Sequence, residues 1–435
     1  MRFFQPKLLT SFKGYKARDY ISDIVAGVIV AIIALPLSIA LAIASGAPPV
    51  TGLFTAIIAG FFTSLLGGSK VNITGPTAAF ATIVAGIIAT QGLDGLFLAT
   101  IMAGILLIIM GLCRVGSLIK FIPHTITVGF TSGIAVTLAI GQLKDFFGLT
   151  YPAGTNAIET IDKLVLVVEN ISTFNPWAFG VGILGLLILI FFPKLIKKVP
   201  ASLVAVIIGA LVCLIPVVSV NTIGSLYTIS SNLPQFSFPT ITGERILALL
   251  PSAFTIALLA GIESLLSCVV SDKMVGDKHN SNTELIALGT SNILVGCFGG
   301  IPATGAIART AANVKNGGKS PLSGMVHAIV LLLVLVLLMP LASYIPMSII
   351  AAILMMVAYN MSEWREFVHI CKSKKWNDIL VLVLTFVLTV VFDLVKAIAV
   401  GIVVHYAIVL VKFIIAKRKA KQTQQENVTE QDQQN

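Results

Sequence analysis

Long apolar runs fill most of the sequence from Ile21 to Ala416, and short basic or Gly/Pro-containing breaks separate them. Most runs hold about 20 residues, the length of helix that crosses a hydrocarbon layer of about 30 Å. The pattern therefore predicts an all-α polytopic membrane protein. We predict fourteen transmembrane segments, at residues 21–44, 49–67, 71–90, 95–113, 121–142, 175–193, 200–218, 246–270, 284–299, 301–314, 321–341, 343–360, 376–393 and 396–416.

The basic residues indicate the orientation of these segments, because Lys and Arg collect in cytoplasmic loops. With both termini in the cytoplasm, every Lys and Arg lies on the inner side except Lys144, Lys163, Arg245 and Lys396 outside and Arg309 within a segment. We therefore expect a multi-pass protein of the cell membrane, such as the inner membrane of a bacterium, with both termini cytoplasmic.

Two segments are too short to span the bilayer as helices. The third, VNITGPTAAFATIVAGIIAT, and the tenth, IPATGAIARTAANV, each open with Gly, Pro and Thr and leave only about ten to fifteen residues of helix. Irregular backbone at membrane depth must be buried in protein or line a water-filled cavity. We predict two half-helices whose extended entries lie inside the protein.

The short segments occupy the third place in each set of seven, and Ile-Pro recurs at Ile122-Pro123 and Ile345-Pro346 in matching places. Because seven is odd, the second set must be inverted relative to the first, an arrangement typical of secondary transporters. The predicted organisation is listed here: a cytoplasmic interfacial segment at 1–20, a first repeat at 21–218, an extracellular loop at 219–245, a second repeat at 246–416 and a disordered cytoplasmic tail at 417–435.

Composition supports the membrane class and excludes most soluble functions. Hydrophobic residues make up 57% of the chain, charged residues 11%, and the mean hydropathy is +0.98. The net charge of +10 follows from the basic inner loops, so it does not predict a nucleic-acid partner. We expect the five cysteines to be free thiols, and we find no metal-ligand spacing and no enzyme motif. The sequence predicts no enzyme, no cofactor and no resident metal.

The two predicted half-helices could form an anion site together. If they enter from opposite sides, their N-termini meet, and each brings unpaired N–H groups and the positive end of a helix dipole. Thr74, Gly75 and Thr77 open one half-helix, and Thr304 to Ala306 open the other. Small residues can also serve only helix packing. Their paired placement favours an anion site.

Arg309 and Glu263 are charges at membrane depth, where each needs a partner or water. Arg309 suits an oxyanion because the guanidinium is planar and always charged. Glu263 could bind and release a proton, or ligate Na⁺ together with Ser267 one helical turn away. Alternatively the two residues form a structural ion pair. We expect His327 and His405 to be packed, hydrogen-bonded residues rather than proton relays.

Three stretches resemble the SulP anion transporter family, the sulfate permease-like carriers. They are GAPPVTGLFTAIIAGFFTSLLGGSKVNITGPTAA at 46–79, GIESLLSCVVSDKMVGDKHNSNTELIALGTSNILVGCFGGIPATGAIARTAANVKNGGKSPLSG at 261–324, and AYNMSEW at 358–364. The resemblance runs from about residue 15 to 416. It implies a core domain of segments 1–4 and 8–11, a gate domain of segments 5–7 and 12–14, and elevator-type movement between them.

The resemblance also implies a substrate site between segments 1, 3 and 10. Its positions fall on Leu37, Leu41, Thr77, Ala78, Ala306, Ile307, Ala308 and Arg309, and the coupling positions fall on Glu263 and Ser267. In sodium-dependent bicarbonate carriers the acidic position resembles Asp, and the position of Arg309 looks smaller. These two departures favour H⁺ over Na⁺ as the coupling cation.

A further departure concerns the end of the chain. Members of the family usually continue into a cytoplasmic STAS domain, and this sequence stops shortly after its last predicted segment, which fits either a truncated or a naturally short form. A homodimer is compatible with the resemblance.

The function expected from the sequence is secondary active transport of a small oxyanion across a lipid bilayer. Bicarbonate, sulfate and dicarboxylates all remain open as the anion. The alternatives are a nucleobase transporter of similar fold and a passive anion channel.

Overall fold

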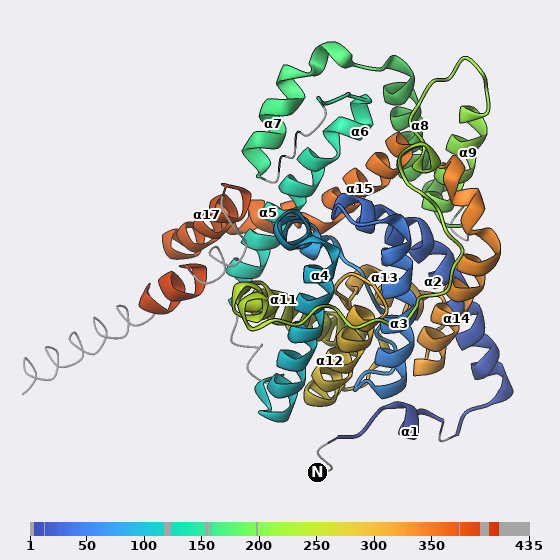
Figure 1. The fold of residues 1–435 in the computed structure, drawn as a ribbon. Helices are drawn as coiled ribbons and strands as arrows, with labels where there is room; N and C mark the ends of the chain where they lie inside the picture. The colour runs from blue at the N-terminus through green and yellow to red at the C-terminus, as the bar shows by residue number, and fades with distance from the viewer. Residues whose placement is uncertain are drawn as a thin grey trace, which may run out of the picture. The chain divides into compact units, whose positions relative to one another are not determined.

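The computed structural model describes residues 4–12, 14–116, 123–152, 155, 157, 159–196, 199–373, 375–391 and 400–408, and these are mostly helical (Figure 1). The elements are α1 (Leu8–Ser11), α2 (Ala17–Ala44), α3 (Pro49–Leu66), β1 (Thr74–Gly75), η1 (Ala78–Phe80), α4 (Ala81–Leu112), α5 (His124–Gly141), α6 (Leu143–Phe147), α7 (Thr160–Glu169), η3 (Ile171–Thr173), α8 (Pro176–Leu195), α9 (Ala201–Cys213), α10 (Ile223–Leu226), α11 (Gly243–Val275), α12 (Ser281–Cys297), β2 (Thr304–Gly305), α13 (Ile307–Lys315), α14 (Pro321–Leu338), η4 (Met339–Tyr344), α15 (Met347–Met361), α16 (Trp364–Lys372) and α17 (Trp376–Val391).

Eight helical stretches among the described residues are long and apolar enough to cross a membrane. Two shorter apolar helices, α9 and α17, coincide with predicted segments 7 and 13. Most of the fourteenth segment and the whole tail at 417–435 lie outside the described residues, although residues 400–408 are helical.

The third and fourth predicted segments form one long helix rather than two helices joined by a loop. Helix α4 continues through the predicted break, and only Gly92 departs from helical geometry, with φ of 69° and ψ of −175°. Glycine tolerates a positive φ that a residue with a Cβ resists. The half-helix therefore ends in a kink, and the predicted loop at 91–94 is absent.

The N-terminal segment contacts the inner ends of three other elements. The Lys7 amide donates to the Gly67 carbonyl at 2.9 Å, and the Gln5 amide donates to the Thr283 hydroxyl at 3.3 Å. Asp277 binds the ammonium groups of Lys7 at 2.9 Å and of Lys70 at 3.2 Å. Burial alone would raise the pKa of Asp277, but the hydrogen bonds from Lys7, the Lys278 backbone and Lys70 hold this pKa below its ordinary value.

The chain divides into two compact units. The larger comprises Met1–Ile119 and Ala135–Asn360, and the smaller comprises Lys120–Ile134 and Met361–Asn435. Both half-helices belong to the larger unit, where α13 lies in the middle of the surrounding helices (Figure 1).

Glycines bring the central helices of the larger unit into close contact. A Cβ at Gly104 of α4 would lie 2.6 Å from the Gly289 carbonyl oxygen, and a Cβ at Gly289 of α12 would lie 2.5 Å from the Gly104 carbonyl oxygen. Such reciprocal contacts between small residues are how membrane helices pack, because lipid leaves little hydrophobic drive between them. The glycines thus let α12 lie directly against α4, beside the half-helix.

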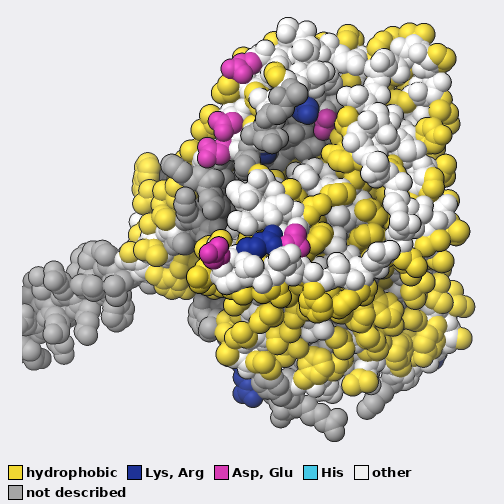
Figure 2. All heavy atoms as spheres, viewed as in Figure 1, with side chains coloured by type: hydrophobic (Ala, Val, Ile, Leu, Met, Phe, Trp, Pro, Cys, Tyr) yellow, Lys and Arg dark blue, Asp and Glu magenta, His cyan; other side chains and the backbone are white. Residues whose placement is uncertain are grey.

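Hydrophobic side chains cover much of the described surface. In Figure 2 they form an almost continuous band over α3, α12 and α14, and charged side chains stand in small groups outside it. A soluble protein rarely exposes so large an apolar area. The band fits a lipid-facing surface.

Candidate functional site

The two predicted half-helix entries meet in an antiparallel pair. Thr74 pairs with Gly305 and Gly75 with Thr304, so β1 and β2 form a two-stranded ladder. The Ala306 amide adds a hydrogen bond to the Ile73 carbonyl at 2.8 Å. Helix α13 starts directly after β2, and η1 and α4 follow β1. Two short helices therefore begin on opposite strands of one ladder, as the inverted arrangement predicts.

Arg309 is buried behind this ladder, with 2% of its surface exposed. Its Nη2 donates to the Pro76 carbonyl oxygen at 3.0 Å, while Nε and Nη1 have no hydrogen-bond partner among the described residues. The guanidinium lies against the Cα of Gly75, because a Cβ at that position would overlap Nη1. Gly75 thus makes room for the arginine, and two of its donor groups are available for a further acceptor.

The alternative of an ion pair between Arg309 and Glu263 is not what the structure shows. The salt bridges found among the described residues do not include these two side chains. Glu263 Oε2 instead accepts a hydrogen bond from the Thr77 hydroxyl at 3.1 Å. A predicted coupling residue is thereby joined to a predicted substrate residue.

The twelve predicted site residues divide by accessibility. Those at least partly exposed are Leu37, Thr77, Glu263, Ala306, Ile307 and Ala308, and those buried are Leu41, Thr74, Gly75, Ala78, Ser267 and Arg309. The exposed members include the start of α13 and the end of the β1 entry. An anion at the helix ends would therefore meet the first turn of α13 and Thr77, with the charge of Arg309 behind them.

Two of the predicted residues have surroundings that the sequence did not indicate. Leu37 packs against a cluster formed by Ile349, Val206 and their neighbours from α9 and α15. The Ser267 hydroxyl is bonded to Asn72 Oδ1 at 2.7 Å and to Thr310 Oγ1 at 3.0 Å. Ser267 is thus part of a polar cluster with Asn72 and Thr310.

Glu284 and Asn72 are central to the site's support, and the sequence analysis did not select them. Glu284 is 1% exposed, and its Oε2 accepts from the Gly68 and Ser69 amides at 2.8 and 3.1 Å. Its Oε1 accepts from Asn72 Nδ2 at 2.7 Å. The signal that could have found Glu284 is the cap residue Asn280, which starts α12 and puts Glu284 one turn inside it.

The histidine at position 327 also differs from expectation. His327 of α14 is packed and 0% exposed, as predicted, but neither ring nitrogen has a hydrogen-bond partner among the described residues. The five cysteines are free thiols, as expected.

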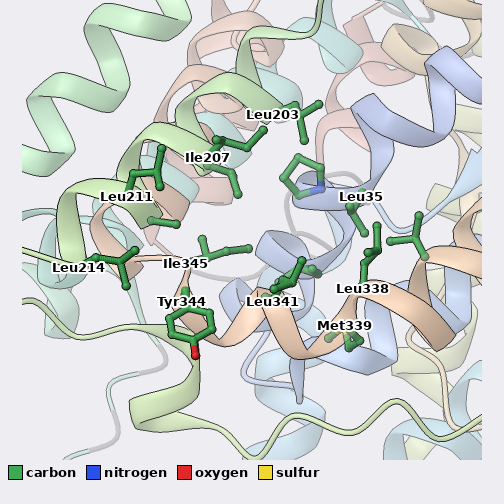
Figure 3. Close-up of a pocket in the computed structure, with 16 residues that line it drawn as sticks. Leu35, Leu203, Ile207, Leu211, Leu214, Leu338, Met339, Leu341, Tyr344 and Ile345 are labelled. Atoms are coloured by element: carbon green, nitrogen blue, oxygen red, sulfur yellow. The ribbon is translucent and has the colours of Figure 1, made fainter.

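A cavity of about 590 Å³ lies on another side of α2 (Figure 3). Leu35 and Pro36 of α2, Ile207 and Leu211 of α9, and Ile345 lie on its walls, and its lining contains no charged side chain. A small anion would lose its hydration there without gaining a partner. The candidate anion site is therefore the crossing of the half-helices and not this apolar cavity.

Comparison with known proteins identifies the family. Residues 20–385 match the model of the sulfate permease family. The chain belongs to the sulfate permease family. It is 44% identical over 397 residues to "Putative sulfate transporter YvdB" of Bacillus subtilis (strain 168), covering 91% of this chain and 74% of that protein.

Bicarbonate transporters are also similar to this chain. The identity is 32% over 398 residues to the bicarbonate transporter BicA of Picosynechococcus sp., covering 89% of this chain and 69% of that protein. The solved transmembrane domain of a cyanobacterium BicA matches with a TM-score of 0.80 at 31% identity, over 88% of this chain and 98% of that structure. The family consists of membrane transporters rather than enzymes, so the chain is a multi-pass membrane transporter.

Proposed function

We propose that the chain is a secondary active transporter of a small oxyanion, with sulfate and bicarbonate as the first candidates. The names of its relatives support these two anions. A dicarboxylate is the third candidate, because its carboxylate offers the same planar oxygen pair to a guanidinium.

The observation that carries the proposal is the antiparallel crossing with a buried arginine behind it. Two helix starts meet at β1 and β2, and each supplies N–H groups and a positive dipole end. Arg309 adds a full charge and keeps Nε and Nη1 free of protein partners among the described residues. The sum is a positive focus inside a membrane protein, which attracts an anion and disfavours a neutral nucleobase.

Cation coupling is proposed at Glu263. Its hydrogen bond from Thr77 links the coupling carboxylate to the β1 entry, so protonation or cation binding at Glu263 would alter a group beside the anion. Because Ser267 is hydrogen-bonded to Asn72 and Thr310, we favour H⁺ over Na⁺ ligated by Glu263 and Ser267.

We further propose the architecture of fourteen segments in two inverted repeats, 21–218 and 246–416, with elevator-type movement of core against gate. The antiparallel register of β1 and β2 supports the inversion. The contact of Lys7 and Lys70 with Asp277 supports placing these residues on one side of the membrane, which the basic-residue pattern identifies as the cytoplasm. A homodimer in a bacterial inner membrane is the proposed assembly.

The anion site is tested with Arg309→Ala and Arg309→Lys in proteoliposomes. Counterflow of labelled sulfate, bicarbonate and a dicarboxylate, at two pH values and with and without Na⁺, selects the anion. A charge at about 8 Å contributes roughly 2 kcal/mol at an effective dielectric constant of 20, so Arg309→Ala should raise the KM about 30-fold. Lysine should restore part of the affinity. An unchanged KM in Arg309→Ala would reject the anion site.

The coupling carboxylate is tested with Glu263→Gln, which keeps the shape and an acceptor for Thr77. We expect uptake against a gradient to lose its dependence on an imposed pH difference, while counterflow without a gradient continues. A variant that still accumulates anion in response to the pH difference would exclude Glu263 as the proton carrier.

A further inference from the structure

Helices α3 and α14 exchange polar side chains across two glycines. A Cβ at Gly60 of α3 would lie 3.2 Å from His327 Nδ1 of α14, and a Cβ at Gly324 of α14 would overlap Ser64 Oγ of α3. Each glycine thus makes room for the polar side chain of the opposite helix. His327 is 0% exposed and Ser64 is 5% exposed, so both polar groups are enclosed by protein.

These enclosed groups have no protein partners. Neither nitrogen of His327 and not the hydroxyl of Ser64 makes a hydrogen bond to another described residue. A buried imidazole needs one acceptor and one donor, and native proteins satisfy such groups with protein atoms or ordered water. A water molecule takes two to four hydrogen bonds in a polar site, which matches the groups presented here.

The same place adjoins the β1 strand. The Cβ position of Gly60 lies 3.5 Å from the Thr74 carbonyl oxygen, so this oxygen and His327 Nδ1 both approach one point on α3. One turn earlier on α3, the Cα of Ala56 lies 3.6 Å from the Cβ position of Gly75, which in turn touches Arg309. The imidazole and the guanidinium therefore adjoin neighbouring residues of β1.

We propose that His327 is a positioning residue for the anion site. Through a buried water shared with Ser64 and the Thr74 carbonyl, His327 fixes β1 between α3 and α14. Because Arg309 donates to the Pro76 carbonyl two residues further on, the position of β1 sets the position of the guanidinium. This inference rests on the proposed role of Arg309, and the experiment separates the two.

The test compares His327→Leu, which removes both nitrogens, with His327→Asn, which keeps a donor and an acceptor near Nδ1. Uptake of labelled sulfate, or of bicarbonate if counterflow selects it, is measured in proteoliposomes with equal amounts of folded protein. We expect His327→Leu to raise the KM about tenfold with a nearly unchanged maximal rate, and His327→Asn to stay within about threefold of the parent. Ser64→Ala should raise the KM in the same direction by a smaller factor.

A double-mutant cycle assigns the route. Combined with Arg309→Lys, where the guanidinium is already lost, His327→Leu should have little further effect on the KM, since coupled residues are not additive. The inference is overturned by an unchanged KM in His327→Leu, by equal damage from Leu and Asn, or by full additivity with Arg309→Lys. Loss of the anion site itself would show separately, as an unchanged KM in Arg309→Ala.

Discussion

The two strands of the crossing share a Thr-Gly pair but are held by different chemistry. Around β1, the backbone is fixed by Glu284 at Gly68 and Ser69, and by Thr310 Oγ1, which accepts from the Ile73 amide at 3.0 Å. Around β2, neutral side chains do this work. Asn292 exchanges hydrogen bonds with the Ala303 backbone at 2.9 and 3.0 Å.

The difference shows how a membrane protein separates structural from functional charge. The carboxylate of Glu284 has its acceptor capacity met by two backbone amides and Asn72, which is how a buried charge becomes tolerable. Arg309, on the β2 side, has one protein acceptor and two unpaired donor groups among the described residues. A fully partnered charge supports the fold, and a partly partnered one is available to a ligand.

The largest expected effect is on stability, from removing the charged anchor of the β1 entry. Glu284→Ala leaves the Gly68 and Ser69 amides and Asn72 without their acceptor, each costing about 1–3 kcal/mol. We expect a loss of roughly 3–5 kcal/mol, seen as a large drop in melting temperature in detergent. Asn292→Ala, at the β2 entry, should lose less. Equal losses would mean that the two anchors do not differ.

The second prediction exchanges the glycines of the ladder. In Gly75→Ala the new methyl meets the end of the flexible Arg309 side chain, whereas in Gly305→Ala it meets Ser264 Cα at 2.9 Å. Gly75→Ala should therefore raise the KM for the anion about tenfold with little change in melting temperature. Gly305→Ala should mainly lower the melting temperature, because backbone must move. Measuring both quantities for both variants tests the assignment, and the reverse outcome contradicts it.

The third prediction removes the hydroxyl of matching threonines. Thr77→Val deletes the hydrogen bond to Glu263, and Thr304→Val deletes the one to the Ala260 carbonyl at 2.8 Å. We expect Thr77→Val to shift the pH dependence of uptake with an unchanged melting temperature. Thr304→Val should destabilise the protein by about 1 kcal/mol and leave the pH profile in place. A pH profile altered only in Thr304→Val would place coupling on the other strand.

The smallest effect is expected at the inner end of the β1 entry, where Lys70 and Lys7 meet Asp277. The pKa of Asp277 is lowered, so its contribution to stability is present at neutral pH and is lost as the pH falls below about 4. Asp277→Asn should cost less than about 1 kcal/mol at pH 7 and nothing at pH 3, by thermal unfolding. A loss that persists at pH 3 would exclude the ion pair as its cause.

Much of this arrangement could be predicted from the sequence. The Gly/Pro/Thr entries at 71–77 and 301–306 contradict a membrane helix so plainly that their burial and pairing follow from backbone hydrogen bonding alone. Arg309 and Glu263 were visible as charges in apolar surroundings. Their separate partners, the Pro76 carbonyl and Thr77, were not visible, because they depend on contacts between segments about 190 to 230 residues apart.

The support around the site was harder to foresee. Glu284, Asn72 and Asn292 lie near segment ends, where polar residues usually face water, and only the tertiary fold buries them. The continuity of α4 through Gly92 was missed because glycine breaks a helical pattern in sequence but bends a helix in the membrane.

The ladder between β1 and β2 also constrains how the protein is made. Thr74 enters the membrane long before Gly305 is synthesised, so its strand waits for its partner through most of translation. During that interval the β1 entry has no ladder to satisfy its backbone. Insertion of the first half is therefore a provisional state, and the later half completes both the fold and the binding site in a single docking step.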